Sequence, residues 1–188
     1  MKELFYTPLD VAAILSTWDL NCREELQIAS GIWTYETEFL DPKYRFQRKE
    51  FLYAVRYWGH YFYDKPSLDI EFPAVQKDLY AVGSRMDSEQ LTSDFSNLDL
   101  FFKNVRLKIL FYQQQDYIRI KLRTLLARYG YKRRSPILID HILTCLAFYH
   151  LSASLRGGEP CDIRTVPLDK MIVFRVEDCT IQDSEEYK

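Results

Sequence analysis

The 188-residue sequence has little of the chemistry that builds the common metal and covalent sites. It contains three histidines and four cysteines, and no two cysteines form a CxxC pair. Zinc-finger spacing is therefore missing, and no cysteine has an evident neighbouring base that would activate it as a nucleophile. We expect no metal and no cofactor. Unpaired thiols of this kind are typical of a reducing, cytoplasmic compartment.

Long apolar runs and a targeting segment are also missing. No stretch approaches the roughly 18 consecutive apolar residues of a membrane span. Residues 1–20 include Asp10 and Asp19 and do not show the basic start and apolar run of a signal peptide. The glycine pair in RGGEP, residues 156–160, lacks the Lys-Ser/Thr of a phosphate-binding loop and predicts a helix end. We expect no membrane contact.

What the sequence does contain is typical of a folded globular domain. Hydrophobic residues make up 47% and charged residues 28%, and the length suits one domain with a sizeable core. Aromatic residues are abundant, with fourteen Tyr, twelve Phe and three Trp. Because Tyr and Trp combine a large apolar body with a polar tip, they serve cores and binding faces alike.

Helix-start signals mark the first part of the chain. Thr7 is a candidate N-cap, Pro8 suits the first helical position, and Asp10 adds negative charge to the first turn. Asn21 followed three residues later by Glu24 predicts a second helix that begins with a capping box. Further on, a short helix is expected over about 74–82, between two segments that have loop signals.

An aromatic-rich helix is expected over residues 43–63. Its segment YAVRYWGHYFY, residues 53–63, has more large rings than one helix stripe can bury. We expect Leu52, Val55 and Trp58 to face the core, while the remaining tyrosines are either part of a crowded interior or a contact surface. The interface candidates are Tyr53, Tyr57 and Tyr61.

The longest helical pattern runs over about 97–129. Ser96 and Asp99 look like a capping pair at its start, and Gly130 suits a left-handed C-cap. The segment QQQD, residues 113–116, is a point at which this pattern could kink or divide.

A second helix is expected over 136–155, with Ser135-Pro136 as its cap and first turn. It is apolar nearly all round, which predicts burial. The segments CDIRTV and MIVFRV then predict a β-hairpin over residues 161–176.

This order of helix, basic turn, helix and hairpin resembles part of a winged helix-turn-helix, with residues 161–176 as the wing. The resemblance covers about the last 75 residues and implies nucleic-acid binding. A recognition helix needs polar side chains for base edges, and 136–155 offers little beyond Asp140, Thr144 and Ser152. We therefore expect contact with the phosphate backbone and no strong reading of sequence.

Charge is distributed unevenly along the chain. The net charge is −2, yet residues 117–139 carry seven cations and no Asp or Glu, which leaves −9 for the remainder. Such a segment suits a row of phosphates, and its tyrosines could stack on bases. The simpler alternative is a solvated helix end, where cations are favoured anyway. The candidate nucleic-acid-binding residues are Arg119, Lys121, Arg123, Arg128, Tyr129, Tyr131, Lys132, Arg133 and Arg134.

Arg134 and His141, with six residues between them, resemble the short Arg-x₄₋₆-His signature of HEPN-family ribonucleases, which are helical. In that family the Arg and His of paired protomers act on the RNA backbone. The alternative is a surface Arg134 and a His141 satisfied by Asp140 or a backbone group. His141 and Cys145 share a helix face at i and i+4, but no second pair of ligands is evident, so we expect no metal there.

Together the patterns predict a mainly α-helical fold of about six helices with a small C-terminal β-hairpin. We expect an N-terminal helical region over 1–95, a basic region over 96–176 and a flexible acidic tail over 177–188. The favoured function is a non-catalytic accessory or regulatory protein that contacts DNA or RNA backbone. The first alternative is a protein–protein interaction module, as an inhibitor or a subunit of a larger assembly. A HEPN-like ribonuclease is the less favoured alternative.

Overall fold

The computed structural model describes residues 4–62 and 95–177 of the chain. Within these ranges it is mainly α-helical with one small antiparallel sheet, which confirms the predicted fold class. The elements in chain order are α1 (Pro8–Ser16), α2 (Cys22–Tyr35), the 3₁₀ turns η2 (Thr37–Phe39) and η3 (Pro42–Tyr44), α3 (Arg48–Phe62), α6 (Ser96–Phe111), β1 (Tyr117–Lys121), α7 (Leu122–Arg128), α8 (Pro136–Phe148), β2 (Leu151–Leu155) and β3 (Met171–Val176).

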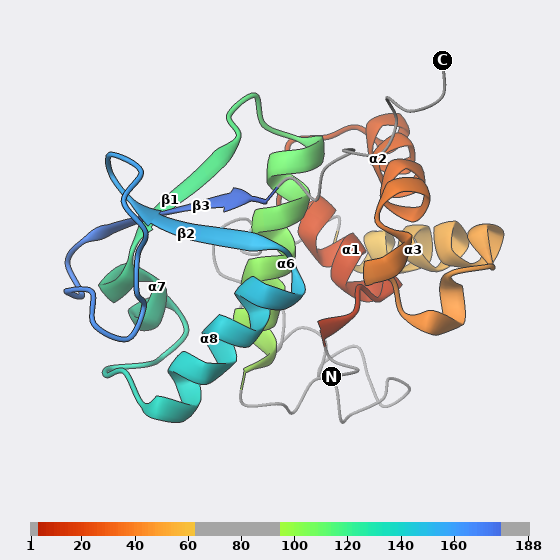
Figure 1. Ribbon diagram of the computed structural model, residues 1–188. Helices are drawn as coiled ribbons and strands as arrows, with labels where there is room; N and C mark the ends of the chain where they lie inside the picture. The colour runs from red at the N-terminus through yellow and green to blue at the C-terminus, as the bar shows by residue number, and fades with distance from the viewer. Residues whose placement is uncertain (1–3, 63–94, 178–188) are drawn as a thin grey trace, which may run out of the picture.

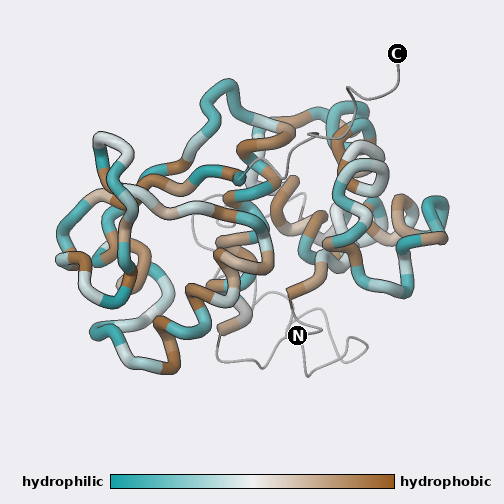
Figure 2. Tube along the Cα trace, in the orientation of Figure 1, coloured by the Kyte–Doolittle hydropathy of each residue, from teal (hydrophilic) through white to brown (hydrophobic). Residues whose placement is uncertain are grey.

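Helix α6 lies in the middle of the molecule. It contacts α1 and α2 on one side and α8, β1 and β3 on the other, and Figure 1 shows it between these two groups. Apolar residues are concentrated along α1 and α8 and alternate with polar residues along α6 (Figure 2). The buried side chains form one cluster that joins both groups, so a single core runs through α6.

The local helix signals are confirmed. Thr7 Oγ1 accepts a hydrogen bond from the Asp10 backbone N–H at 3.1 Å, and the Asp10 carboxylate accepts one from the Thr7 N–H at 2.9 Å. Asn21 and Glu24 form the same reciprocal box at the start of α2. Such boxes satisfy N–H groups that a helix start leaves without partners.

The signals around α8 are confirmed as well. The Ser135 hydroxyl caps α8 by accepting from the Leu138 N–H at 3.2 Å, and Pro136 is its first residue. Gly130 has a φ of +84°, the left-handed conformation expected just past a helix end. The predicted helix over 74–82 lies outside the described residues.

The long helix expected over 97–129 is divided at QQQD, residues 113–116, the break point that the sequence suggested, and the prediction of a helix directly after it is wrong. Helix α6 ends at Phe111, and Tyr117–Lys121 form strand β1 before α7 begins. In β1, Ile118 and Ile120 alternate with exposed Arg119 and Lys121, a two-residue period that suits a strand with one covered face. Pairing with β3 decides between the two readings of this segment.

The capping pair expected from Ser96 and Asp99 is also wrong. Phe95 is the N-cap of α6 and makes no side-chain cap hydrogen bond. Asp99 is buried, and its carboxylate is hydrogen-bonded to His141 and Cys145 on α8. The side chain therefore joins two helices and does not cap its own.

The hairpin over 161–176 is half right. Strand β3 forms as expected, but its partner is β2, residues that the prediction placed in the helix over 136–155. Helix α8 ends at Phe148, and His150 then adopts a φ of +47°, which turns the chain into β2. CDIRTV lies in the loop between the two strands and is not a strand itself.

The sheet order is β1-β3-β2, with both pairings antiparallel. From α6 to β3 the element order is helix, strand, two helices and two strands, and the last strand, β3, occupies the centre of the sheet.

Three charged side chains lie on the buried face of α6, at positions i, i+4 and i+7: Asp99, Lys103 and Arg106. Lys103 Nζ forms an ion pair with Asp10 Oδ2 of α1 at 2.7 Å. Because buried charges are costly unless they are paired, each contact of this kind also specifies which element lies opposite α6.

The pair between Arg106 and Glu36 is bidentate, with nitrogen–oxygen distances of 2.6 and 3.1 Å. Arg106 Nη1 also donates to the Tyr149 carbonyl at 2.8 Å, and the guanidinium carbon lies 4.3 Å from the Phe39 ring centroid. Burial raises the pKa of Glu36, and the hydrogen bonds from Arg106 oppose that rise. One guanidinium therefore connects α6 to the end of α2 and to the residue after α8.

We expect Arg106→Ala to lower the free energy of unfolding by about 3–5 kcal/mol, since it leaves the Glu36 carboxylate buried without its partner. The matched control is Arg123→Ala, which removes an exposed bidentate pair with Asp169. It should change stability far less, because water solvates both partners. Urea denaturation measures both, and equal losses would show that the buried pair has no special weight.

Candidate nucleic-acid interface and a buried polar cluster

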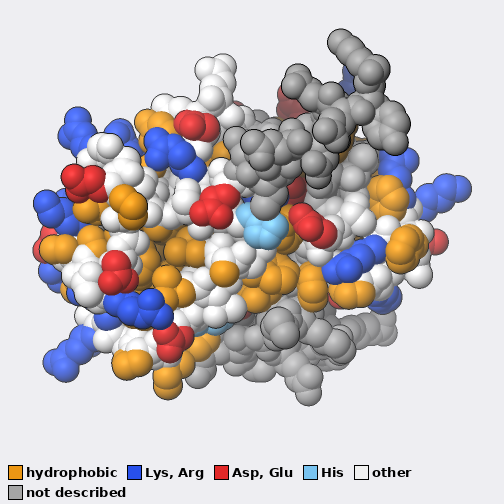
Figure 3. Space-filling model, viewed as in Figure 1, with side chains coloured by type: hydrophobic (Ala, Val, Ile, Leu, Met, Phe, Trp, Pro, Cys, Tyr) orange, Lys and Arg blue, Asp and Glu red, His pale blue; other side chains and the backbone are white. Residues whose placement is uncertain are grey.

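The predicted cations lie on three consecutive elements. Arg119 and Lys121 are on the same face of β1, Arg123 and Arg128 are on α7, and Lys132 and Arg133 are in the turn that leads to α8; all six are exposed. Figure 3 shows Lys and Arg side chains along the edge of the molecule that carries the sheet and α7. We name the exposed set Arg119, Lys121, Arg128, Lys132 and Arg133 the basic face.

Arg123 is exposed but engaged. Its guanidinium binds Asp169 through two hydrogen bonds of 2.6 and 2.9 Å, and its backbone N–H donates to the Leu168 carbonyl at 2.8 Å. The hydrogen bonds from the Arg123 side chain lower the pKa of Asp169. Arg123 therefore attaches α7 to the loop between β2 and β3, and its charge is partly neutralised.

Arg134 is a structural residue. Its Nη1 donates to the Ile163 carbonyl at 3.1 Å and to the Val166 carbonyl at 2.7 Å, both in the β2–β3 loop. The side chain is partly buried, so these bonds hold the loop against the start of α8. We leave Arg134 out of the basic face for this reason.

The two tyrosines of the segment face inward. Tyr129 packs edge-on against Phe101, with ring centroids 6.0 Å apart, and burial raises the pKa of its hydroxyl. Its ring is partly buried against the core, which leaves less of it to stack on a base. Tyr131 is half-buried and stacks on Phe95 at 6.1 Å, which leaves part of the ring at the surface.

Helix α8 buries one face and exposes another. Ile137 is 72% exposed, and the exposed positions that follow are Asp140, Thr144 and Ala147. Asp140 is within 3.5 Å of Arg164 in the β2–β3 loop. This face has few groups that could read base edges, as expected from the sequence.

A pocket of about 410 Å³ adjoins the basic face, between α6 and β1. Its lining includes the cations Lys108, Arg119 and Arg128 and the amides of Asn104 and Gln113. The lining residues within the described part of the chain include no Asp or Glu. The Gln113 amide nitrogen already donates to the Gln115 and Tyr117 carbonyls, so it is the three cations that suit this concave site to an anionic group such as a phosphate.

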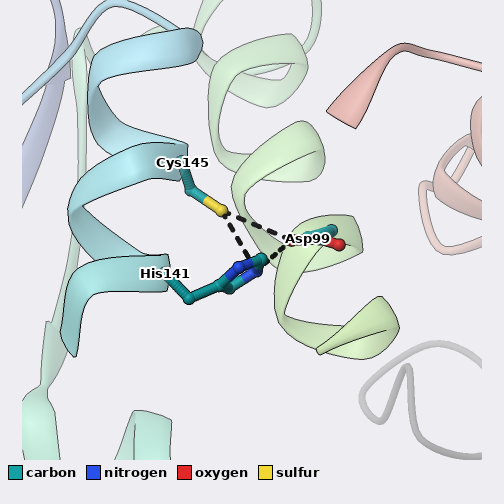
Figure 4. Close-up of side chains that lie close together, drawn as sticks. All are labelled: Asp99, His141 and Cys145. Atoms are coloured by element: carbon teal, nitrogen blue, oxygen red, sulfur yellow. Dashed lines mark hydrogen bonds and ion pairs between the residues drawn. The ribbon is translucent and has the colours of Figure 1, made fainter. Parts of the chain in front are cut away.

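A second polar group lies in the interior, between α6 and α8. Asp99 Oδ1 is hydrogen-bonded to His141 Nε2, and the Cys145 thiol donates to the same carboxylate oxygen at 3.4 Å. Cys145 Sγ is 3.6 Å from His141 Nε2 (Figure 4). Burial, with the neighbouring Asp99 carboxylate, raises the pKa of the Cys145 thiol.

The partner of His141 differs from the one expected. The sequence suggested Asp140 or a backbone group, whereas the structure provides Asp99, 42 positions earlier on another helix. No local pattern reveals such a pair, although the i, i+4 spacing of His141 and Cys145 does place them on one face. Arg134 and His141, the residues of the HEPN-like signature, bind different partners, the β2–β3 loop and Asp99.

The aromatic candidates on α3 are divided between surface and interior. Tyr53 is 75% and Tyr57 48% exposed, while the side chain of Tyr61 lies outside what the structure describes. Val55 is buried and Leu52 and Trp58 are partly buried against the core. Tyr53 and Tyr57 share a helix face because they are four residues apart.

Searches against protein-family models, curated proteins and solved structures each found no match to this chain. Within residues 4–62 and 95–177, no helix combines the length and apolar character needed to cross a membrane.

We expect Arg134→Ala to lower the free energy of unfolding by about 1.5–3 kcal/mol, because two buried carbonyls lose a charged donor. Arg133→Ala is the control: the neighbouring side chain is exposed and its loss should change stability by less than about 0.5 kcal/mol. Thermal and urea unfolding provide the comparison. Identical stabilities would mean that Arg134 does not hold the loop.

Proposed function

We propose that this protein binds DNA or RNA through the phosphate backbone, using the basic face as its contact surface. The observation that carries the proposal is the position of these cations. They lie on β1, α7 and the following turn of a winged helix-turn-helix arrangement, in a segment that has no acidic residue. Lys and Arg on such a surface gain affinity by releasing the counterions condensed on nucleic acid.

The mode of binding follows from what surrounds the basic face. The exposed side of α8 offers Ile137, Asp140 and Thr144, which supports binding without strong base reading. The pocket between α6 and β1 adds a concave site for one phosphate beside the exposed cations. A non-catalytic accessory or regulatory role fits this surface. The ribonuclease alternative is less well supported, because Arg134 binds the β2–β3 loop and His141 binds Asp99.

We expect the double variant Lys132→Ala/Arg133→Ala to weaken binding to labelled duplex and single-stranded nucleic acids. Its plot of log affinity against log salt should be shallower by about one unit for each lost phosphate contact. Fluorescence anisotropy across a salt series measures both quantities. Arg134 is kept in this variant, so that the β2–β3 loop stays attached.

The matched control is Lys49→Ala/Arg56→Ala, which removes two exposed cations from α3 and changes net charge by the same amount. This control variant should have the same salt slope as the native chain. If the two double variants lose affinity equally, the effect reflects overall charge and the basic face is not the site. If neither binds differently from the native chain, the proposal fails.

The exposed aromatics on and before α3 favour protein–protein interaction as a second candidate function. Phe46 is 93% exposed, and Tyr53 and Tyr57 add two further rings. Aromatic side chains of this kind are enriched at the centres of interfaces. Both functions suit a reducing cytoplasm, in which the free thiols of Cys22 and Cys161 persist.

For this second candidate we expect Tyr53→Ala/Tyr57→Ala to abolish co-purification of a stoichiometric protein partner, because it removes both rings of one helix face. The same variant should bind nucleic acid as the native chain does. Affinity capture with the native chain and with the variant, followed by quantification of bound protein, makes the test. Equal capture by both chains would exclude this face as the interface.

A further inference from the structure

We propose that Asp99, His141 and Cys145 form a binding site for a divalent transition-metal ion of the zinc class. The site is independent of the basic face and lies between α6 and α8. One oxygen, one nitrogen and one sulfur atom, all within 4.8 Å of one another, converge there from two helices (Figure 4). Carboxylate, imidazole and thiolate are the three ligand types that zinc takes from proteins.

Two of the three donor–donor distances suit tetrahedral coordination. Zinc bonds of about 2.3 Å to sulfur and about 2.0–2.2 Å to nitrogen or oxygen, at tetrahedral angles, place ligand atoms about 3.3–3.6 Å apart. The observed separations from Cys145 Sγ are 3.6 Å to His141 Nε2 and 3.4 Å to Asp99 Oδ1. His141 and Asp99 are joined by a hydrogen bond and lie closer together than two zinc ligands do, so this pair must move apart when a metal ion replaces the hydrogen bond.

The arrangement differs from a catalytic relay. In a Cys-His-Asp relay the two ring nitrogens of the histidine bind different partners, and the proton moves through the ring. Here Asp99 and Cys145 both approach the same nitrogen, Nε2. Three donor atoms that surround one point suit a shared metal ion better than a transferred proton.

Burial and charge also fit a metal ion. Asp99 is 2% exposed, and its second oxygen, Oδ2, has no hydrogen-bond partner within the described residues. A buried carboxylate oxygen without a partner is costly, and a nearby cation would compensate it. A thiolate and a carboxylate together carry two negative charges, which balance a divalent ion in the interior.

The scaffold and the access route are consistent with binding. His141 and Cys145 are one turn apart on α8, and Asp99 is on the facing turn of α6, so helical backbone holds all three ligands. The His141 side chain is 18% exposed, which leaves a route from solvent. On binding, the Cys145 S–H bond breaks, the metal–sulfur bond forms and the thiol proton passes to solvent. The metal ion takes the Nε2 lone pair of His141, so the imidazole stays neutral with its one proton on Nδ1.

The test uses the full chain and Co²⁺, whose thiolate complexes absorb by sulfur-to-metal charge transfer. Cys145 is buried, and its removal could unfold the protein, so the decisive variant keeps it and replaces the others: Cys22→Ala/Cys161→Ala/Cys179→Ala. Cys22 is exposed and Cys161 is half-exposed. We expect this variant to bind one Co²⁺ with the charge-transfer band of the native chain, and Zn²⁺ to displace it. Loss of the band in this variant, or no stoichiometric binding by the native chain, overturns the proposal.

Asp99→Asn tests the carboxylate, because the amide has nearly the same shape and lacks the charge. We expect Co²⁺ affinity to fall by about tenfold to a hundredfold or more. Removing a residue that only hydrogen-bonds to a metal ligand already lowers affinity by this range, and Asp99 is proposed as a ligand itself. Circular dichroism confirms that the variant is folded. A folded Asp99→Asn chain with unchanged affinity would remove Asp99 from the ligand set and overturn the three-ligand site.

Discussion

The structure depends on the pairing of charged side chains on the buried face of α6. Asp99, Lys103 and Arg106 lie along one stripe of this helix and meet His141 of α8, Asp10 of α1 and Glu36 at the end of α2. An apolar face could pack in several registers at similar cost. A buried charge is tolerated only opposite its partner, so each pair selects one arrangement of the neighbouring elements. Helix α6 thereby positions the N-terminal helices and the C-terminal sheet region relative to each other.

The proposed functional surfaces are arranged around this helix. The basic face lies on β1, α7 and the next turn, beyond the core that α6 organises, and α8 connects that turn to the buried cluster of Asp99, His141 and Cys145. An ion bound in the cluster would join α6 to α8 directly. The exposed rings of Tyr53 and Tyr57 lie on α3, in the other group of helices, so the two candidate partners would meet different parts of the molecule.

Local sequence signals predicted local structure well. Thr7 with Asp10, Asn21 with Glu24, Ser135 and Gly130 all mark helix ends where expected, because capping depends on residues a few positions apart. The errors arose where contacts between residues far apart in the sequence decide the secondary structure. Tyr117–Lys121 continue a helical pattern but pair with β3, 50 or more positions later. Leu151–Leu155, which the prediction placed in a helix, form strand β2 of the same sheet.

The candidate site shows the same division. The exposed cations could be predicted from the distribution of charge along the sequence. The structural role of Arg134 could not, since its hydrogen-bond acceptors are backbone carbonyls about 30 positions away. Asp99 looked like a helix cap because its nearest neighbours in sequence fit that role. Only the packing of α6 on α8 brings it to His141 and Cys145.

The loop between β2 and β3 is held at two points, the start of α7 and the start of α8. Arg123 fastens it to the start of α7, and Arg134 fastens it to the start of α8. Binding through a long loop normally costs conformational entropy, because the loop must become ordered when the partner binds. Here that ordering is completed when the chain folds. The loop and the turn therefore present themselves to any partner as one preorganised surface.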